Sequence, residues 1–452
     1  MKIIVCGCGK IGSTICTDLV AEGHDVVALD NDTAVVTQIT NTLDVMGVCG
    51  NGADCETLAD AGIAETELFI AVTGSDELNM LSCFLAKRMG AGHTIARIRN
   101  PEYNDESLDF MKRELELSMA INPELLAAKE LYDILNIPTA VKVESFAGHA
   151  FEMIELKIKE NSPLDGLVLK ELREKHKTRV LICVVQRGDE VYSPDGNFVL
   201  REGDKIGLTA SPEEIDRFLR SIGLMQKKAR DVIILGGSRT AFYLAKMLEM
   251  SGSGVKIIEK NPEVAENLSD SLDDTIVIRG DGTEQELLLE EGLLSTDAFV
   301  TLTGSDEQNI LISIYASSRN VPKVIAKVNR NELYYMAEKL GLDSIISPKK
   351  IISNVLVQYA RALENSRESQ METLYKLMDG QVEALEFHVM QDSHITDIPL
   401  KELKLKENIL IAGIIRGRRT IVPGGNDAIL PGDRVVIIVE NQRLRDLADI
   451  LK

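Results

Sequence analysis

The chain has 452 residues, of which 44% are hydrophobic and 27% are charged, as is typical of soluble globular proteins. Its formal net charge of −21 argues against sequence-independent binding to nucleic acid or to an anionic membrane. The apolar runs are strand-sized and the N-terminus carries no signal-peptide pattern, so we expect a cytosolic protein. The odd number of cysteines argues against a disulfide framework, and their spacing is not that of a zinc site.

The N-terminal segment, IIVCGCGKIG after Met1 and Lys2, predicts a nucleotide-binding loop. Three glycines in G-x-G-x-x-G spacing follow an apolar strand and open a helix, which is the context of a dinucleotide-binding turn. The predicted loop consists of Gly7, Cys8, Gly9, Lys10, Ile11 and Gly12. Asp30 ends the next apolar run, where a carboxylate accepts hydrogen bonds from ribose hydroxyls and repels a 2′-phosphate. This pattern favours NAD or an adenosine nucleotide over NADP.

The first lobe reads as alternating strands and helices. Short apolar runs, separated by amphipathic stretches of helical length, lie at residues 3–7, 25–30, 45–50, 68–73, 94–98 and 118–122. Uninterrupted apolar runs in this alternation predict an α/β fold with six parallel strands in a doubly wound sheet.

Polar residues follow several of these strands and are further candidates for the site. Ligands bind beyond the carboxyl ends of the strands in such sheets. The candidates are Asn51 and Asp54 after the third strand, Thr73, Gly74, Ser75 and Asp76 after the fourth, and Arg97 on the fifth. Ser75 and Asp76 also fit helix capping. Arg97 and Arg99 alternate along their strand, so one can reach a phosphate while the other forms an interface pair.

A second, smaller lobe follows a predicted helix at residues 123–135. Apolar alternation predicts strands at residues 154–158, 180–188 and 205–210, and helices at residues 167–175 and 212–223. This is the pattern of a small α+β module.

The chain then repeats itself. TGSDELN, beginning at Thr73, returns as TGSDEQN at Thr303, and GNGADCETLADAG at Gly50 returns as GDGTEQELLLEEG at Gly280, both 230 residues later. The small lobe repeats as well, because REGDKI, which contains Gly203, resembles LPGDRV, which contains Gly432. The chain is therefore two tandem copies of a larger and a smaller lobe.

The glycine loop of the second copy differs at the decisive place. GGSRTA puts Ser238 and Ala241 at the second and third glycine positions, and the serine adds a Cβ where the backbone should approach a phosphate. The weaker candidates of this copy are Gly236, Ser238, Arg239, Glu259, Asp281 and Thr303, with Arg239 as a possible compensating anion binder. We leave open whether this site binds a nucleotide more weakly, binds another one, or is only scaffold.

Nothing in the sequence predicts catalysis. The histidines of the small lobes do not recur at equivalent positions, and no nucleophile constellation or phosphate-hydrolysing P-loop is present. Binding without catalysis is the favoured interpretation. An NAD-dependent oxidoreductase with duplicated halves and a soluble nucleotide sensor for another transporter remain the alternatives.

The motifs GCGKIG, GNGAD, TGSDELN and ARIRNPEY, followed by a small lobe and then by the whole set again, resemble the TrkA family. Its members are tandem RCK (KTN) proteins, the peripheral regulatory subunits of bacterial Trk potassium uptake. The resemblance covers essentially the full chain. It implies Rossmann-like nucleotide-binding domains at residues 1–136 and 230–365, and small α+β domains at residues 137–225 and 370–452.

The resemblance also implies ligands, partners and location. The expected cofactor is NAD(H) or ATP/ADP, bound by Gly7, Gly9, Gly12, Asp30, Thr73 and Arg97. The expected partner is a potassium-transporting membrane protein of the TrkH or TrkG type, and the expected assembly is a homotetrameric ring. The protein would lie in the cytoplasm at the inner face of the plasma membrane. We further expect Arg97 or Arg99 to distinguish a triphosphate from a diphosphate.

Overall fold

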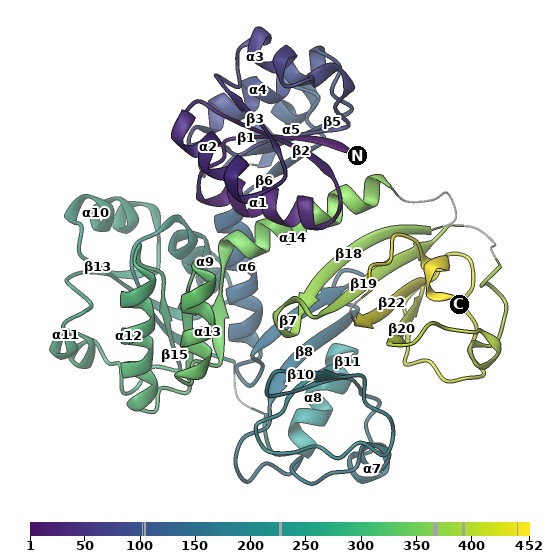
Figure 1. Ribbon diagram of the computed structural model, residues 1–452. Coiled ribbons are helices and arrows are strands. Elements are labelled where there is room, and N and C mark those ends of the chain that lie inside the picture. The colour runs from purple at the N-terminus through teal and green to yellow at the C-terminus, as the bar shows by residue number, and fades with distance from the viewer. Residues whose placement is uncertain (102, 104, 226–227, 365–368, 391–393, 441) are drawn as a thin grey trace. The chain divides into compact units, whose positions relative to one another are not determined.

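The computed structural model describes the chain except for residues 102, 104, 226–227, 365–368, 391–393 and 441 (Figure 1). The predicted junctions at 225–230 and 365–370 include some of these residues and so lie partly outside the described chain. The chain forms two compact units, one of Met1–Lys129 with Ser347–Ala360 and the other of Glu130–Ile346 with Arg361–Lys452. Among the described residues, no helix has the length and apolar character that crossing a membrane requires.

The first unit contains a six-stranded parallel sheet in the order β3-β2-β1-β4-β5-β6 (Figure 1). Its strands are β1 (Lys2–Cys6), β2 (Asp25–Asp30), β3 (Met46–Cys49), β4 (Leu68–Ala71), β5 (His93–Arg97) and β6 (Met119–Ile121). Its helices are α1 (Lys10–Ala21), α2 (Thr33–Thr42), α3 (Cys55–Asp60), α4 (Asp76–Arg88) and α5 (Asp105–Glu114). The predicted doubly wound parallel sheet is confirmed.

Burial explains why these strands read as uninterrupted apolar runs. β4 is buried along its whole length and β1 is buried from its second residue onward, because helices cover both faces of such a sheet. The strand order reverses between β1 and β4, so the loops that follow these two strands diverge and leave room for a ligand.

A segment from far along the chain completes the first unit. Most of α14 (Pro348–Leu363) belongs to it, although α14 follows the second parallel sheet in sequence. The buried Ser353 hydroxyl donates to Asp18 of α1 at 2.5 Å, and the Tyr359 hydroxyl lies 3.2 Å from His93 Nδ1. The sequence did not predict that α14 packs with the first unit.

The second unit contains the second parallel sheet, in the matching order β14-β13-β12-β15-β16-β17. Its strands are β12 (Asp231–Leu235), β13 (Gly254–Glu259), β14 (Ile276–Arg279), β15 (Ala298–Thr301), β16 (Lys323–Lys327) and β17 (Ser344–Ile346). Its helices are α9 (Arg239–Met250), α10 (Pro262–Ser271), α11 (Gln285–Glu290), α12 (Asp306–Ser318) and α13 (Asn331–Lys339). The two parallel sheets therefore repeat one topology.

Two five-stranded antiparallel sheets form the small lobes, in the orders β10-β9-β11-β8-β7 and β18-β19-β22-β20-β21. The first has β7 (Lys142–Phe146), β8 (Phe151–Lys157), β9 (Leu181–Arg187), β10 (Glu190–Tyr192) and β11 (Lys205–Ala210). The second has β18 (Ser369–Leu377), β19 (Val382–Val389), β20 (Ile409–Arg416), β21 (Arg419–Ile421) and β22 (Arg434–Glu440). The remaining α-helices are α6 (Pro123–Asn136), α7 (Leu169–His176) and α8 (Pro212–Ser221). The sequence did not predict β7 and β10.

The two small lobes share a hydrophobic core within the second unit. Phe146, Phe151 and Met153 of the first lobe pack with Ala384 and Val436 of the second. A Cβ on Gly413 of β20 would lie 2.6 Å from the Phe151 ring, so the close approach of the lobes requires glycine there.

The same ion pair, between a partly exposed arginine and a buried aspartate, recurs in each small lobe. Asp204, whose side chain is fully buried, accepts two hydrogen bonds of 2.7 Å from the Arg187 guanidinium, and Asp433 accepts bonds of 2.8 and 2.7 Å from Arg416. Each aspartate follows a glycine with positive φ, which explains the repeated glycine–aspartate pair in the sequence.

We predict that Asp204→Ala destabilises the first small lobe by on the order of 3 kcal/mol, because it leaves the Arg187 charge partly buried without its partner. Chemical denaturation of the full chain, with hydrogen exchange at β9 and β11, measures the loss. Asp109→Ala is the control, since Asp109 forms an exposed pair with Lys112 and should change stability by less than about 0.5 kcal/mol. Equal effects of the two variants would contradict the prediction.

Candidate functional site

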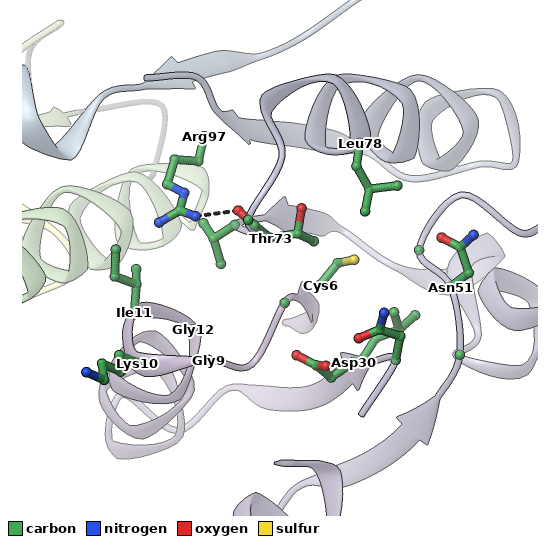
Figure 2. Close-up of a pocket in the computed structure, with 17 residues that line it drawn as sticks. Cys6, Gly9, Lys10, Ile11, Gly12, Asp30, Asn51, Thr73, Leu78 and Arg97 are labelled. Atoms are coloured by element: carbon green, nitrogen blue, oxygen red, sulfur yellow. Dashed lines mark hydrogen bonds between the residues drawn. The ribbon is translucent and has the colours of Figure 1, made fainter. Parts of the chain in front are cut away.

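A cleft of about 470 Å³ lies beyond the carboxyl ends of the central strands of the first sheet (Figure 2). It brings together ten of the predicted site residues: Gly7, Gly9, Lys10, Ile11, Gly12, Asp30, Asn51, Thr73, Gly74 and Arg97. They come from the first strand–helix turn and from the ends of β2, β3, β4 and β5.

A different steric requirement explains the glycine at each of the three loop positions. Gly7 has a φ of +93°, and a Cβ there would lie 2.7 Å from the Thr73 nitrogen. A Cβ on Gly12 would lie 1.9 Å from the Gly7 carbonyl oxygen, so α1 can pass this close to the loop only with glycine. No atom lies within 4 Å of a Cβ built on Gly9, whose open side faces space that a ligand can fill.

The N-terminus of α1 opens into the cleft without a side-chain cap. Gly9 is the N-cap residue and supplies no capping hydrogen bond, and the next three residues, Lys10, Ile11 and Gly12, line the cleft. Uncapped amide groups and the positive end of the helix dipole favour an anion. This end of the cleft therefore suits a phosphate group.

Asp30 is held in place at the other end of the loop. Its Oδ2 accepts the Cys8 backbone N–H at 2.6 Å, and its Oδ1 accepts the Asp32 N–H at 3.0 Å. The carboxylate lines the cleft, where it can accept hydrogen bonds from ribose hydroxyls.

Arg97 supplies a buried cation. Its side chain lines the cleft and donates from Nη2 to the Thr73 carbonyl, as the dashed line in Figure 2 shows. Asn79 braces both residues: its Nδ2 donates to the Arg97 carbonyl at 2.9 Å, and its Oδ1 accepts the Thr73 N–H at 2.7 Å. Asn79 is fully buried and does not line the cleft, so it is a positioning residue.

Four predicted site residues do not line the cleft with their side chains. The Asp54 carboxylate caps α3 through the Thr57 N–H at 2.9 Å, and the Ser75 hydroxyl caps α4 through the Leu78 N–H at 3.2 Å. Asp76 accepts the Asn100 N–H at 2.8 Å, and the Cys8 thiol is buried beneath the loop. These side chains make local hydrogen bonds, and the helix-capping role expected for Ser75 is present; their roles toward a ligand stay predictions.

The Arg99 side chain also makes local contacts within its own domain. Its Nε lies 3.3 Å from the Asp76 carboxylate, and its Nη2 donates to the Gly74 carbonyl at 2.6 Å. β5 ends at Arg97, so Arg99 lies beyond the strand on which the sequence placed it, and Arg97 is the arginine that lines the cleft.

Sequence reasoning missed the remaining lining residues: Cys6, Leu29, Asn31, Gly50, Gly52, Val72 and Leu78. Gly50 and Gly52 belong to the repeated GNGAD motif, which was a usable signal. The others lie at strand ends or inside a helix and carry no motif of their own. Burial raises the pKa of the Cys6 thiol to about 12, so this cysteine is a neutral wall of the cleft.

A second cleft of about 580 Å³ occupies the same place on the second sheet. Of its predicted residues, Gly236, Ser238, Glu259, Asp281 and Thr303 line it. Arg239 does not, so the structure does not place it as a compensating anion binder.

Few groups for acid–base or metal chemistry line the first cleft. Among its described lining residues there is no histidine, and Asp30, its carboxylate, is held by two backbone amides. Within the described part of the chain, no three His, Cys, Asp or Glu side chains are placed to hold a metal ion.

Known proteins match the whole chain. The TrkA-N domain family matches residues 3–123 and 232–348, and the TrkA-C domain family matches residues 153–223 and 384–452. The "Trk system potassium uptake protein TrkA homolog" of Archaeoglobus fulgidus is 31% identical over 452 residues, covering 100% of both chains. "Trk system potassium uptake protein TrkA" of Haemophilus influenzae is 29% identical over 98% of this chain and 96% of that protein.

The solved structures agree on the fold. "GsuK channel bound to NAD" is similar with a TM-score of 0.63 and 17% identity, over 97% of this chain and 77% of that chain. "Crystal Structure of the GsuK RCK domain" has the same TM-score and identity, over 97% of this chain and 92% of that chain. With two TrkA-N and two TrkA-C domains in tandem, the chain belongs to the TrkA family.

Proposed function

We propose that this chain is a nucleotide-binding regulatory subunit of a Trk-type potassium uptake system. One observation carries the proposal: an intact glycine loop, two cations and a ribose-facing carboxylate surround one cleft. Family membership supports the link to potassium transport, since the relatives are named as Trk potassium uptake proteins.

The ligand of the first cleft is NAD(H) or ATP/ADP. An adenosine ribose at Asp30 places the following phosphates toward the N-terminus of α1, where Lys10 and Arg97 carry positive charge. The similar GsuK structures include one bound to NAD and one bound to ADP, which supports both classes of ligand.

The partner is a potassium-transporting membrane protein of the TrkH or TrkG type, bound at the cytoplasmic face of the plasma membrane. We propose that the chain assembles as a homotetramer. Leu81 of α4 is 48% exposed and Leu311 of α12 is 66% exposed, and the two lie at equivalent positions of the repeat. Matching apolar side chains on matching helices suit a repeated subunit contact.

Regulation requires the nucleotide to bind one conformation more tightly than another, and a difference of about 1–3 kcal/mol is sufficient for strong control. Contacts in the first unit connect the glycine loop to α14. α1 begins at the glycine loop, and its Asp18 accepts the Ser353 hydrogen bond from α14. A ligand that repositions α1 therefore acts on α14, which continues into the second unit.

An oxidoreductase would need a general acid or base beside the nicotinamide. The described lining of the first cleft offers no histidine, and its one carboxylate, Asp30, accepts two backbone hydrogen bonds. A nucleotide sensor for an unrelated transporter would have the same cleft. The identity of the membrane partner therefore distinguishes such a sensor from a Trk regulatory subunit.

We expect the tagged full chain to co-purify from membranes with a polytopic potassium transporter encoded in the same organism. Identification of the co-purified protein by mass spectrometry is the measurement, with an unrelated tagged soluble protein as control. Reproducible recovery of a different transporter, or of none, would contradict the Trk assignment.

Arg97→Ala should bring the affinities for ATP and ADP together, because a buried guanidinium stabilises added phosphate charge by charge-assisted hydrogen bonds. Isothermal titration calorimetry on the full chain gives both dissociation constants. Lys327→Ala is the matched control, since Lys327 occupies the equivalent position of the second copy and should leave the ratio at its wild-type value. An unchanged ratio in Arg97→Ala would refute this role.

Gly9→Ser gives the first loop the serine that the second loop has at the equivalent position, Ser238. The new side chain meets no protein atom and can cap α1 as Ser238 caps α9, so stability should change by no more than about 0.5 kcal/mol. ADP affinity should fall by about tenfold or more, equal to about 1.4 kcal/mol, because the Cβ occupies phosphate space. Calorimetry and thermal melting test the two parts, and full ADP affinity in this variant would show that phosphate does not approach Gly9.

A further inference from the structure

We propose that the second cleft is a separate ligand site which prefers an uncharged nucleoside to a nucleotide carrying two or three phosphates. The inference rests on the proposed function only in taking the first cleft as the nucleotide site for comparison.

The two clefts share the frame that holds a ribose. The Glu259 carboxylate accepts the Gly237 N–H at 2.6 Å and the Asn261 N–H at 2.7 Å, which repeats the two backbone contacts of Asp30. Asn309 repeats the brace of Asn79, because its Oδ1 accepts the Thr303 N–H at 3.0 Å and its Nδ2 donates to the Lys327 carbonyl at 2.9 Å. The second cleft thus keeps the hydrogen bonds that hold the first cleft open.

The phosphate end of the second cleft is closed to an anion in two ways. The Ser238 hydroxyl accepts the Ala241 N–H at 3.3 Å and so caps α9, whereas α1 has no side-chain cap. The first helical residues, Arg239, Thr240 and Ala241, do not line the second cleft, although their counterparts line the first. Neither helix amides nor the Arg239 cation therefore face a phosphate there.

The fifth strand no longer supplies a cation. Lys327 stands at the position of Arg97, and its Nζ donates to the Leu302 carbonyl at 3.2 Å. Arg97 lines the first cleft, but Lys327 does not line the second.

The third strand adds a negative charge. Asp281 occupies the position of the neutral Asn51, and hydrogen bonds from the Thr283 N–H and hydroxyl lower the pKa of this carboxyl, which therefore stays ionised. The Lys260 charge also lowers this pKa, and Lys260 is the one cation among the described residues that line the second cleft.

The charges that line the two clefts consequently have opposite balance. Lys10 and Arg97 outweigh Asp30 in the first cleft, whereas Glu259 and Asp281 outweigh Lys260 in the second. Two or three phosphates add several negative charges, so like-charge repulsion disfavours them in the second cleft.

The remaining surface of the second cleft suits a base and a ribose. Ile258, Val264, Leu302 and Ile312 give it apolar walls, and Gln308 stands where the first cleft has Leu78. A side-chain amide both donates and accepts hydrogen bonds, as the edge of a nucleobase requires. Apolar walls with a few polar groups are typical of small-molecule sites.

Calorimetry on the full chain with ADP and adenosine as probes tests the inference. We expect one ADP per chain, and we expect the ADP-saturated chain to bind one further adenosine. Glu259→Gln should lower the adenosine affinity of the ADP-saturated chain by at least tenfold and leave the ADP stoichiometry unchanged. Asp30→Asn is the matched control, which should weaken ADP binding and leave the second adenosine site intact.

A gain of function provides the converse test. Ser238→Gly combined with Asp281→Asn restores the open helix end and removes one negative charge, so a second ADP per chain should appear. Intact ADP binding at the first cleft of each second-cleft variant reports that the chain is folded.

Two results would overturn the inference: two equivalent ADP molecules per wild-type chain, or no adenosine bound by the ADP-saturated chain. Absence of ADP, ATP and NADH binding, together with adenosine binding that Glu259→Gln abolishes, would contradict the proposed nucleotide site and support this inference. The two proposals therefore fail separately.

Discussion

The close contact between Gly12 and the Gly7 carbonyl is the constraint on which the first nucleotide cleft depends. A Cβ at residue 12 would lie 1.9 Å from that oxygen, so the first turn of α1 lies against the loop only because glycine is there. This approach aims the uncapped helix N-terminus into the cleft and leaves the open side of Gly9 for a ligand. In the proposed function, Arg97 holds one end of the ligand by charge and Asp30 holds the other by ribose hydrogen bonds.

Duplication has preserved the scaffold and changed the chemistry. Both parallel sheets keep one strand order, and Asn79 and Asn309 brace the fourth and fifth strands in the same way. The ion pairs of Asp204 and Asp433 likewise recur in both small lobes. The clefts differ instead at positions next to the ligand space: Ser238 replaces Gly9, Asp281 replaces Asn51 and Lys327 replaces Arg97. A single chain can then respond to two ligands through one fold.

The fold was predictable from sequence because strands buried on both faces are continuous apolar runs, and because the repeat places every element twice. The lining of the first cleft was predictable where one residue type has one use, as at Gly7, Gly12 and Asp30. It was ambiguous at Asp54 and Ser75, because helix capping and ligand binding demand the same polar residues after the same strands, and both side chains cap helices. Asp76 instead accepts the Asn100 N–H. The placement of α14 in the first unit leaves no periodic signal, since its contacts join segments more than 200 residues apart.

The central claim is that nucleotide binding at the first cleft controls potassium transport. Its most direct test is potassium flux through the membrane partner reconstituted in proteoliposomes with this chain, while ATP, ADP or NADH is titrated. With the wild-type chain, at least one nucleotide should change the flux, and Gly9→Ser should shift the half-maximal concentration upward by about tenfold or more. A nucleotide response identical in both proteins, or no response in the wild type, would contradict the account.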